Sequence, residues 1–407
     1  MNKKNIPELR FPEFDGEWES KKLGEVAERI TTKNKENNKN VLTISAQYGL
    51  INQLNFFNKS VSAKDLTGYY VLSKNDFAYN KSYSNGYPMG AFKRLTLYEK
   101  GVVSTLYICF RNKPCFSNEF AEHCFASGKQ DKEIYKVAQE GARNHGLLNI
   151  VVNDFFGINL TIPSLPEQTK IANFLTVVDK KISQLKQKKA LLKEYKKGMM
   201  QKIFSQKIRF KDENGEDFAE WKLYPVKKIL NKYSNPVKVE PDKHYSQIGI
   251  RSHGKGIFYK EPVSGLSLGN KRVFWIKENR LILNIVFAWE RAISKTTKNE
   301  IGMIASHRFP MYEPAIGLLN LDFILYLFLT PRGKLYLELA SPGGAGRNKT
   351  LGQAQFEKLK ISLPPIEEQT KIANFLTKLD EKINTVDSQI KKTELWKKGL
   401  LQRMFCG

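Results

Sequence analysis

Apolar residues recur with a helical period in two long stretches, residues 168–204 and 369–405. In each stretch, steps of alternately four and three residues give ten positions, and eight of them are apolar. A 3.5-residue repeat is the seam of a coiled coil, narrower than the stripe of a helix on a globular core. Each stretch is therefore predicted to be one helix of about 55–60 Å. The predicted seam residues are Ile171, Leu175, Val178, Ile182, Leu185, Leu192, Ile372, Leu376, Leu379, Ile383, Val386 and Ile390.

The two stretches are copies of each other. Nine residues starting at Gln168 recur letter for letter at Gln369, and an ungapped comparison finds identity at 17 of 37 positions. Two unrelated basic surface helices do not explain this identity, so the chain is predicted to be an internal duplication. Lys196 and Lys397 recur at the same seam position, which places them either beyond the paired region or at its edge, where a lysine can snorkel to water.

The starts of both helices carry their own signals. Residues 164–167 read Ser-Leu-Pro-Glu, the pattern of a capping box with proline in the first turn. Residues 364–368 open the second copy with Pro-Pro-Ile-Glu-Glu. The chain is predicted to run as a globular domain (1–160), a helix (161–206), a second globular domain (207–361) and a second helix (362–407).

Shorter segments within the globular parts predict an α+β fold. Segments rich in β-branched and aromatic residues are expected to be strands: 41–45, 101–111, 281–288 and 358–363. Segments 119–126, 131–138, 322–329 and 333–339 are expected to be helices. The globular parts differ between the halves far more than the long helices do.

The net charge of the chain indicates what kind of partner it binds. The 407 residues carry a formal net charge of +25, and 41% of them are hydrophobic. A folded protein with this excess of positive charge is expected to bind a polyanion, most simply nucleic acid. The chain has neither a run of 18 apolar residues nor the apolar core of a signal peptide. Its four cysteines lack zinc spacing, and a cytoplasmic protein with reduced thiols is expected.

No constellation for catalysis is found in the sequence. The nearest approach to an adenine-methyltransferase loop, at Asn235, lacks the second proline and the aromatic residue. Residues 249–256 imitate a phosphate-binding loop, but Gly256 stands where a magnesium-binding Ser or Thr is needed. The five histidines form no metal-ligand spacing. No catalytic residue, metal or cofactor is therefore assigned to this chain.

Base readout requires polar side chains on loops that can enter a groove. Arg251, His253 and Lys255 in the second domain, and Tyr83, Asn85 and Tyr87 in the first, are the candidates for discrimination, with ordinary glycine-rich turns as the alternative. Trp289 and its two followers could also reach DNA, although a core position is the other interpretation. The full set of candidate DNA-binding residues is Lys81, Tyr83, Asn85, Tyr87, Arg143, Asn144, His145, Arg251, His253, Lys255, Arg347, Asn348 and Lys349. The Arg-Asn pairs at 143–144 and 347–348 occupy equivalent places, which favours a shared task such as phosphate contact or docking.

The repeated Pro-rich, Glu-Gln entry into each helix (163–168 and 364–369), with Arg-Phe to Trp openings at 10–18 and 209–221, resembles the specificity (S) subunit of type I restriction-modification systems. The resemblance covers essentially the whole chain. It implies two pseudo-symmetric target-recognition domains that read a bipartite double-stranded DNA site. The two long helices would form an antiparallel coiled coil that sets the spacer.

The resemblance also implies partners. A non-catalytic S subunit works with methyltransferase (M) subunits, here expected to be two, alone or with restriction (R) subunits, and the partners would carry S-adenosylmethionine, ATP and Mg²⁺. The M subunits are expected to bind the helix faces and parts of each domain. Phe204, Leu400, Leu401 and Phe405 are expected to remain available, with the aromatic residues either contacting a partner or capping the coiled coil. The alternative is a basic coiled-coil scaffold that binds nucleic acid without sequence preference, and a self-sufficient enzyme is disfavoured by the missing motifs.

Overall fold

The computed structural model describes residues 5–45, 48–57, 62–83, 86–139, 148–343 and 349–406. The chain forms two compact units, residues 1–186 with 387–407 and residues 187–386. Each unit therefore combines one globular domain with part of both long helices. The domain limits predicted from the sequence follow the chain instead and stay a prediction. No helix in the described ranges is long and apolar enough to cross a membrane.

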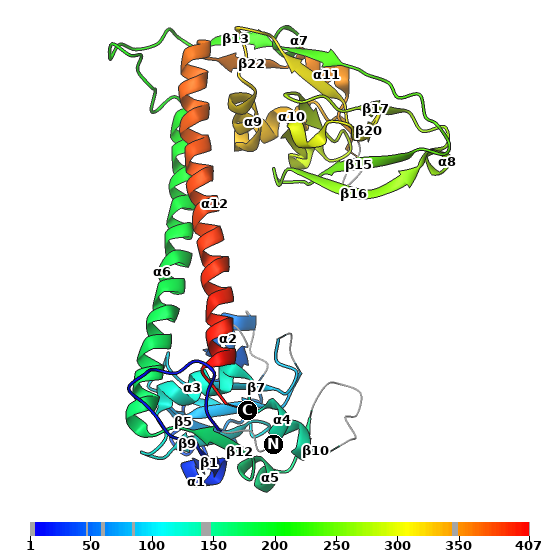
Figure 1. The fold of residues 1–407 in the computed structure, drawn as a ribbon. Coiled ribbons are helices and arrows are strands. Elements are labelled where there is room, and N and C mark those ends of the chain that lie inside the picture. The colour runs from blue at the N-terminus through cyan, green and yellow to red at the C-terminus, as the bar shows by residue number, and fades with distance from the viewer. Residues whose placement is uncertain are drawn as a thin grey trace. The chain divides into compact units, whose positions relative to one another are not determined.

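The two long helices are α6 (Leu165–Phe204) and α12 (Ile366–Arg403), and they pair antiparallel (Figure 1). Within the first unit, Asp179 and Lys186 of α6 contact Lys397 and Glu394 of α12, so the numbering falls on one helix as it rises on the other. Eleven of the twelve predicted seam residues are buried, and Leu192 is half-buried. The predicted antiparallel coiled coil is confirmed.

The seam lysines do not lie beyond the paired region, which was one of their two predicted positions. In the second unit, the Lys196 ammonium lies 2.6 Å from Asp380 on the opposite helix, and the Lys196 side chain is only 16% exposed. In the first unit, Lys397 lies 2.6 Å from Asp179. A carboxylate across the seam compensates each ammonium, so the lysine need not reach bulk water.

The first globular domain contains both strands and helices, as predicted. Its sheet has the strand order β2-β9-β6-β7, and the pairs β1-β12, β3-β4, β5-β8 and β10-β11 lie beside it. The helices are α1 (Leu23–Val26), α2 (Gln53–Phe57), α3 (Asn118–Ser127), α4 (Asp131–Val137) and α5 (Val152–Phe156). The strands are β1 (Glu19–Lys22), β2 (Ala27–Arg29), β3 (Leu42–Ser45), β4 (Gly49–Asn52), β5 (Tyr70–Ser73), β6 (Phe77–Asn80), β7 (Ala91–Arg94), β8 (Lys100–Val103), β9 (Ile108–Asn112), β10 (Ala138–Gln139), β11 (Asn149–Ile150) and β12 (Asn159–Ile162).

The second domain repeats this topology. The order β14-β21-β18-β19 corresponds to β2-β9-β6-β7, and β13-β22 corresponds to β1-β12, while the sheet β16-β15-β20-β17 carries a larger hairpin than the first domain has. The helical elements are α7 (Val226–Ile229), α8 (Gly265–Leu268), η1 (Ala288–Glu290), η2 (Lys298–Glu300), α9 (Leu321–Leu329), α10 (Pro331–Leu339) and α11 (Gln353–Lys358). The strands are β13 (Lys222–Pro225), β14 (Leu230–Tyr233), β15 (His244–Ile250), β16 (Ile257–Ser264), β17 (Val273–Trp275), β18 (Leu281–Leu283), β19 (Ile293–Lys295), β20 (Ile304–Ser306), β21 (Met311–Pro314) and β22 (Lys360–Leu363).

Two of the predicted strands are shorter in the structure than predicted. The segment 101–111 breaks between β8 and β9, where the Tyr107 amide donates to the Ser104 carbonyl in a turn. The segment 281–288 ends as a strand at Leu283, and residue 288 already begins η1. Both errors arise because apolar residues continue through a turn and hide it from the pattern.

Each long helix is joined to its domain by a buried glutamine. Gln168 accepts a hydrogen bond from the Ser117 amide and donates to the carbonyls of Cys115 and Pro163. In the second unit, Gln369 makes the same three bonds, to the Asn320 amide and to the carbonyls of Leu318 and Pro364. One side chain thereby satisfies three backbone groups where the helix leaves the domain.

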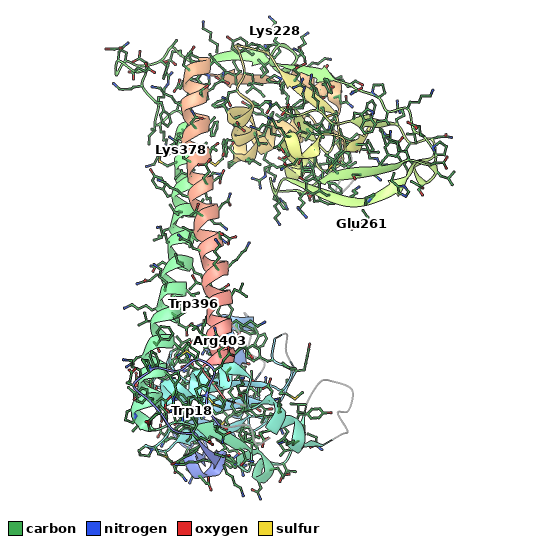
Figure 2. All side chains as sticks on the ribbon, viewed as in Figure 1. Trp18, Lys228, Glu261, Lys378, Trp396 and Arg403 are labelled. Atoms are coloured by element: carbon green, nitrogen blue, oxygen red, sulfur yellow. The ribbon has the colours of Figure 1, made fainter. Side chains whose placement is uncertain are left out.

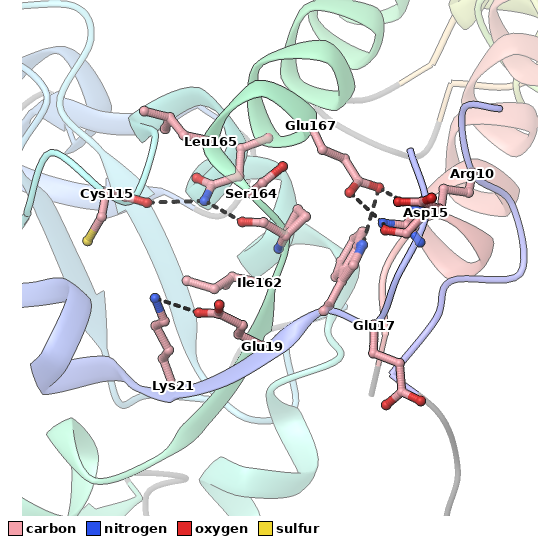
Figure 3. Close-up of a pocket in the computed structure, with 13 residues that line it drawn as sticks. Arg10, Asp15, Glu17, Glu19, Lys21, Cys115, Ile162, Ser164, Leu165 and Glu167 are labelled. Atoms are coloured by element: carbon pink, nitrogen blue, oxygen red, sulfur yellow. Dashed lines mark hydrogen bonds and ion pairs between the residues drawn. The ribbon is translucent and has the colours of Figure 1, made fainter. Parts of the chain in front are cut away.

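The predicted capping box at 164–167 is wrong, because Glu167 binds elsewhere. Its carboxylate accepts a bidentate pair of hydrogen bonds from Arg10 and a third from the Trp18 indole (Figure 3). Glu167 and Arg10 line a pocket of about 380 Å³. Glu368 and Arg209 form the corresponding ion pair in the second unit. Guanidinium and carboxylate match geometrically, which fixes the N-terminal segment against the start of the helix.

The apolar residues expected to remain available for partners are buried in the cores of the units. Leu400, Leu401 and Phe405 pack with Trp18 and Phe120 in the first unit. Phe204 packs with Phe323 in the second. The end of each long helix is thus part of a domain core, because its apolar side chains face the domain rather than solvent.

Candidate nucleic-acid interface

The second domain presents a tight turn at the end of its longest hairpin. Strands β15 and β16 pair antiparallel and are joined by residues 251–256, which we call the recognition turn. The Arg251 amide donates to the Gly256 carbonyl and closes the turn. His253, Gly254 and Gly256 have φ values of 62°, 66° and 79°. The left-handed backbone suits glycine, whereas His253 adopts it at a conformational cost.

This geometry excludes a nucleotide-binding loop at 249–256. A phosphate-binding loop joins a strand to the N-terminus of a helix, whose amides cradle the phosphates. Here the segment joins β15 to another strand, β16. Among the described residues, no group of three His, Cys, Asp or Glu side chains is arranged to hold a metal ion.

The predicted reading side chains are accessible on the recognition turn. Arg251, His253 and Lys255 are all exposed. The Arg251 guanidinium lies 4.9 Å from the ring centroid of Phe258 and donates a long 3.4 Å bond to the Ile257 carbonyl. Stacking on a ring restrains the guanidinium and leaves most of its donors free for another partner.

Lys349, predicted from a distant part of the sequence, reaches the element that supports this turn. Its ammonium lies 5.7 Å from the ring centroid of Trp289 in η1, and the neighbouring Glu290 carboxylate accepts from the Ser252 hydroxyl at 2.8 Å. Trp289 is half-buried and donates to the Val286 carbonyl, so it is neither a core residue nor a fully exposed one. Arg347 and Asn348 lie outside the described residues.

In the first domain, the candidates follow strand β6. Tyr83 is 63% exposed, whereas Tyr87 is half-buried under Lys93, whose ammonium lies 4.7 Å from the ring centroid and 3.2 Å from the hydroxyl. The Lys81 carbonyl accepts from the Leu148 amide at 3.0 Å. Asn85, Arg143, Asn144 and His145 lie outside the described residues.

The two halves share one backbone contact at this place. The Leu148 amide reaches Lys81 just after β6, and the Leu351 amide reaches Ile285 just after β18, at 2.8 Å. Strands β6 and β18 occupy equivalent positions in their sheets. Leu148 and Leu351 are therefore anchored at matching places in the two domains. The equivalence of the Arg-Asn pairs stays a prediction, because both pairs lie outside the described residues.

The sequence did not indicate the residues that support these candidates. Ser252, Glu290, Phe258 and Lys93 hold or stack on the predicted side chains. Ser252 and Glu290 both lie within segments singled out from the sequence, but no periodicity or spacing relates Glu290 to a turn 38 residues earlier. Strands β15 and β16 were themselves not among the strands predicted from the sequence.

Comparison with known proteins decides the family. The sequence profile of the type I restriction modification DNA specificity domain matches residues 15–194 and 250–394, most of the chain and both of its halves. The chain belongs to this family. The predicted resemblance to specificity subunits is thereby confirmed.

Two specificity subunits match this chain at low identity. The putative type I restriction enzyme MjaX specificity subunit of Methanocaldococcus jannaschii is 23% identical over 68% of this chain and 65% of its own length. The MjaVIII specificity subunit of the same organism is 24% identical over 76% of this chain and 74% of its own. The chain therefore spans about two thirds to three quarters of these relatives. A crystal structure of the type I S subunit from M. genitalium has the same fold, with a TM-score of 0.54, 16% identity and 99% coverage of both chains.

Proposed function

We propose that this chain is the DNA-sequence-specificity subunit of a type I restriction-modification complex. It recognises a bipartite double-stranded DNA target and positions methyltransferase subunits on it, with no catalysis of its own. The observation that carries the proposal is a frame present twice with different content. The sheets, the buried glutamines and the ion pairs recur, whereas the β15–β16 hairpin of the second domain is longer than the β3–β4 pair of the first.

Each domain would read one half-site through its own loops. In the second domain, Arg251, His253 and Lys255 are exposed side chains that can donate to base edges in the major groove. In the first domain, Tyr83 and Tyr87 with Asn85 would do so, and Lys81 and the Arg-Asn pairs would contact phosphates. The net charge of +25 supplies the non-specific attraction on which specific readout is built.

Two methyltransferase subunits would bind, one to each half of the chain. An aromatic cluster supports this stoichiometry: Phe174 of α6 meets Phe11 and the half-exposed Trp396 of α12, labelled in Figure 2, with ring centroids 5.8 and 6.1 Å apart. In the second unit, Phe210 meets Phe375 at 5.7 Å. Aromatic side chains left partly exposed at matching places fit a partner that binds twice.

The partners would carry the chemistry. We assign S-adenosylmethionine to the methyltransferase subunits, and ATP and Mg²⁺ to restriction subunits where these join the complex. The two long helices would set the distance between the half-sites, since a coiled coil is stiff along its length. The site of action is the bacterial cytoplasm, where the DNA is.

Methylome sequencing of cells that co-express the chain with its methyltransferase partner tests this function. The expected result is adenine methylation at a two-part motif with a fixed unread spacer. A stable complex that methylates one continuous motif, or none, would overturn the proposal. The alternative of a basic scaffold predicts binding that depends on salt but shows no preference in competition between DNA sequences.

A further inference from the structure

The recognition turn of the second domain rests on η1 through its backbone. The His253 amide donates to the Glu290 carbonyl at 2.8 Å, and the Gly254 amide donates to the Arg291 carbonyl at 3.0 Å. These two bonds span consecutive residues on each side. The tip of the hairpin is therefore attached to the domain body rather than held only by β15 and β16.

A side-chain bond completes the attachment. The Ser252 hydroxyl donates to a carboxylate oxygen of Glu290 at 2.8 Å, and both residues are half-buried. Glu290 thus accepts from the turn with its main chain and its side chain. A hydrogen bond to a charged acceptor is stronger than one to a neutral acceptor. The Ser252 hydroxyl nevertheless requires only an acceptor and not a charge.

The support continues into α9. Arg291, which follows Glu290, has φ of 62° and donates from its guanidinium to the Leu329 carbonyl at 2.9 Å. A Cβ atom at Gly254 would lie 2.3 Å from a methyl carbon of Leu329, so the turn packs directly on the end of that helix. His253 and Arg291 both hold left-handed conformations that non-glycine residues keep only where the surroundings impose them.

We propose that Glu290 is a positioning residue for the second half-site. By holding Ser252 and His253, it fixes the directions in which Arg251, His253 and Lys255 leave the recognition turn. Readout of bases requires side chains to be held closely to one geometry, and supporting hydrogen bonds supply that constraint. This role rests on the proposed function. It adds a residue that controls base readout without being one of the three side chains that contact the bases.

A carboxylate that holds the turn and a carboxylate that contacts a base respond differently to substitution. A carboxylate can itself accept a hydrogen bond from the cytosine amino group, and replacing it with an amide would then change the preferred base. A carboxylate that only accepts from Ser252 can be replaced by the amide of glutamine, whose oxygen accepts the same bond. Alanine at this position removes the acceptor altogether.

The experiment is methylome sequencing of the chain with its methyltransferase partner, using Glu290→Gln, Glu290→Ala and Ser252→Ala. We expect Glu290→Gln to retain the wild-type motif. Glu290→Ala and Ser252→Ala should raise methylation at sites with one substituted base in the second half-site by about tenfold relative to the full site, because one hydrogen bond is lost. The first half-site and the spacer should stay unchanged and serve as internal controls.

Glu261→Ala is the matched control. Glu261 is an exposed carboxylate on β16, labelled in Figure 2, and its removal changes the charge of the same hairpin. It should leave the motif unchanged. Thermal unfolding of each purified variant separates relaxed readout from loss of fold. If Glu290→Ala fails to fold, Ser252→Ala still removes the side-chain bond and keeps both backbone bonds.

Two outcomes overturn the proposal: a changed base preference in Glu290→Gln, or an unchanged motif in both alanine variants. If the wild-type chain gives no two-part motif, the proposed function itself fails, and that result is distinct from either.

Discussion

The ammonium of Lys196 on α6 lies 2.6 Å from both carboxylate oxygens of Asp380 on α12. The same pair occurs in the other unit, where Lys397 lies 2.6 and 2.7 Å from the oxygens of Asp179. Each pair places a lysine at an apolar seam opposite a carboxylate that compensates its charge. Such polar seam positions fix the register of a coiled coil at some cost in stability.

Breaking one of these pairs should destabilise its unit more than removing an exposed charge. Asp380→Ala leaves the poorly exposed Lys196 ammonium without its partner, and we expect a loss of about 1–3 kcal/mol in the free energy of unfolding. The double variant Lys196→Met/Asp380→Ala should recover part of it. Urea unfolding measures both, with Glu381→Ala, an exposed neighbour, as the control. Equal losses for Asp380→Ala and Glu381→Ala would show that the pair contributes nothing.

Acid should weaken the first unit through His123. Burial and the nearby Lys397 ammonium lower the pKa of His123 to about 4, against the opposing charge of Asp179. Below its unfolded pKa of about 6.5, the unfolded chain binds a proton that the folded chain does not. His123 therefore costs the folded unit nothing above pH 6.5. Between pH 6.5 and 4, the free energy of unfolding falls by about 3 kcal/mol because of this residue, and then levels off.

The second unit supplies the variant that tests this dependence. Tyr326 occupies the equivalent place, donates to Asp380 at 2.7 Å, and has its pKa raised above the usual value by burial. His123→Tyr should therefore remove the part of the acid loss that lies between pH 6.5 and 4. Unfolding curves measured across that range provide the comparison, and identical slopes for the variant and the wild type would contradict the assignment.

Gln168 and Gln369 should be intolerant of charge. Replacing either glutamine with alanine leaves one amide and two carbonyls unpaired, and we expect a loss of about 2–4 kcal/mol. Glutamate at the same position could still accept from the amide but would face two carbonyl oxygens, so its loss should be at least as large. Differential scanning calorimetry of each single variant tests this. If Gln168→Glu is as stable as the wild type, the two carbonyl contacts are not significant.

Lengthening both long helices should lengthen the spacer of the DNA target. Seven residues inserted near Lys186 in α6 and near Asp387 in α12 keep the seam in register and add about 10 Å. At 3.4 Å per base pair this corresponds to about 3 base pairs. Methylome sequencing should show both half-sites unchanged. An insertion in one helix alone offers the control, since it shifts the seam on one side and should abolish methylation.

The predictions from sequence were most successful where the information is periodic or repeated. The period of 3.5 and the identity at 17 of 37 positions defined two long helices and their seam, and α3, α4, α9 and α10 were placed within two residues. Helix geometry is local, so residues three and four apart are sufficient to reveal it. The strands at 101–111 and 281–288 were less well placed, because a turn between apolar residues leaves no break in the pattern.

By itself, the sequence determined that the chain is a duplication with two paired long helices, a basic surface and domains of differing content. Only the tertiary structure decided what each polar residue is for. Glu167 binds Arg10 across 157 residues instead of capping its helix, Lys196 meets Asp380 across 184, and Glu290 reaches back to Ser252. Contacts of this kind depend on where the chain returns in space. A linear pattern records the side of an element on which a residue lies, but not the residue that faces it.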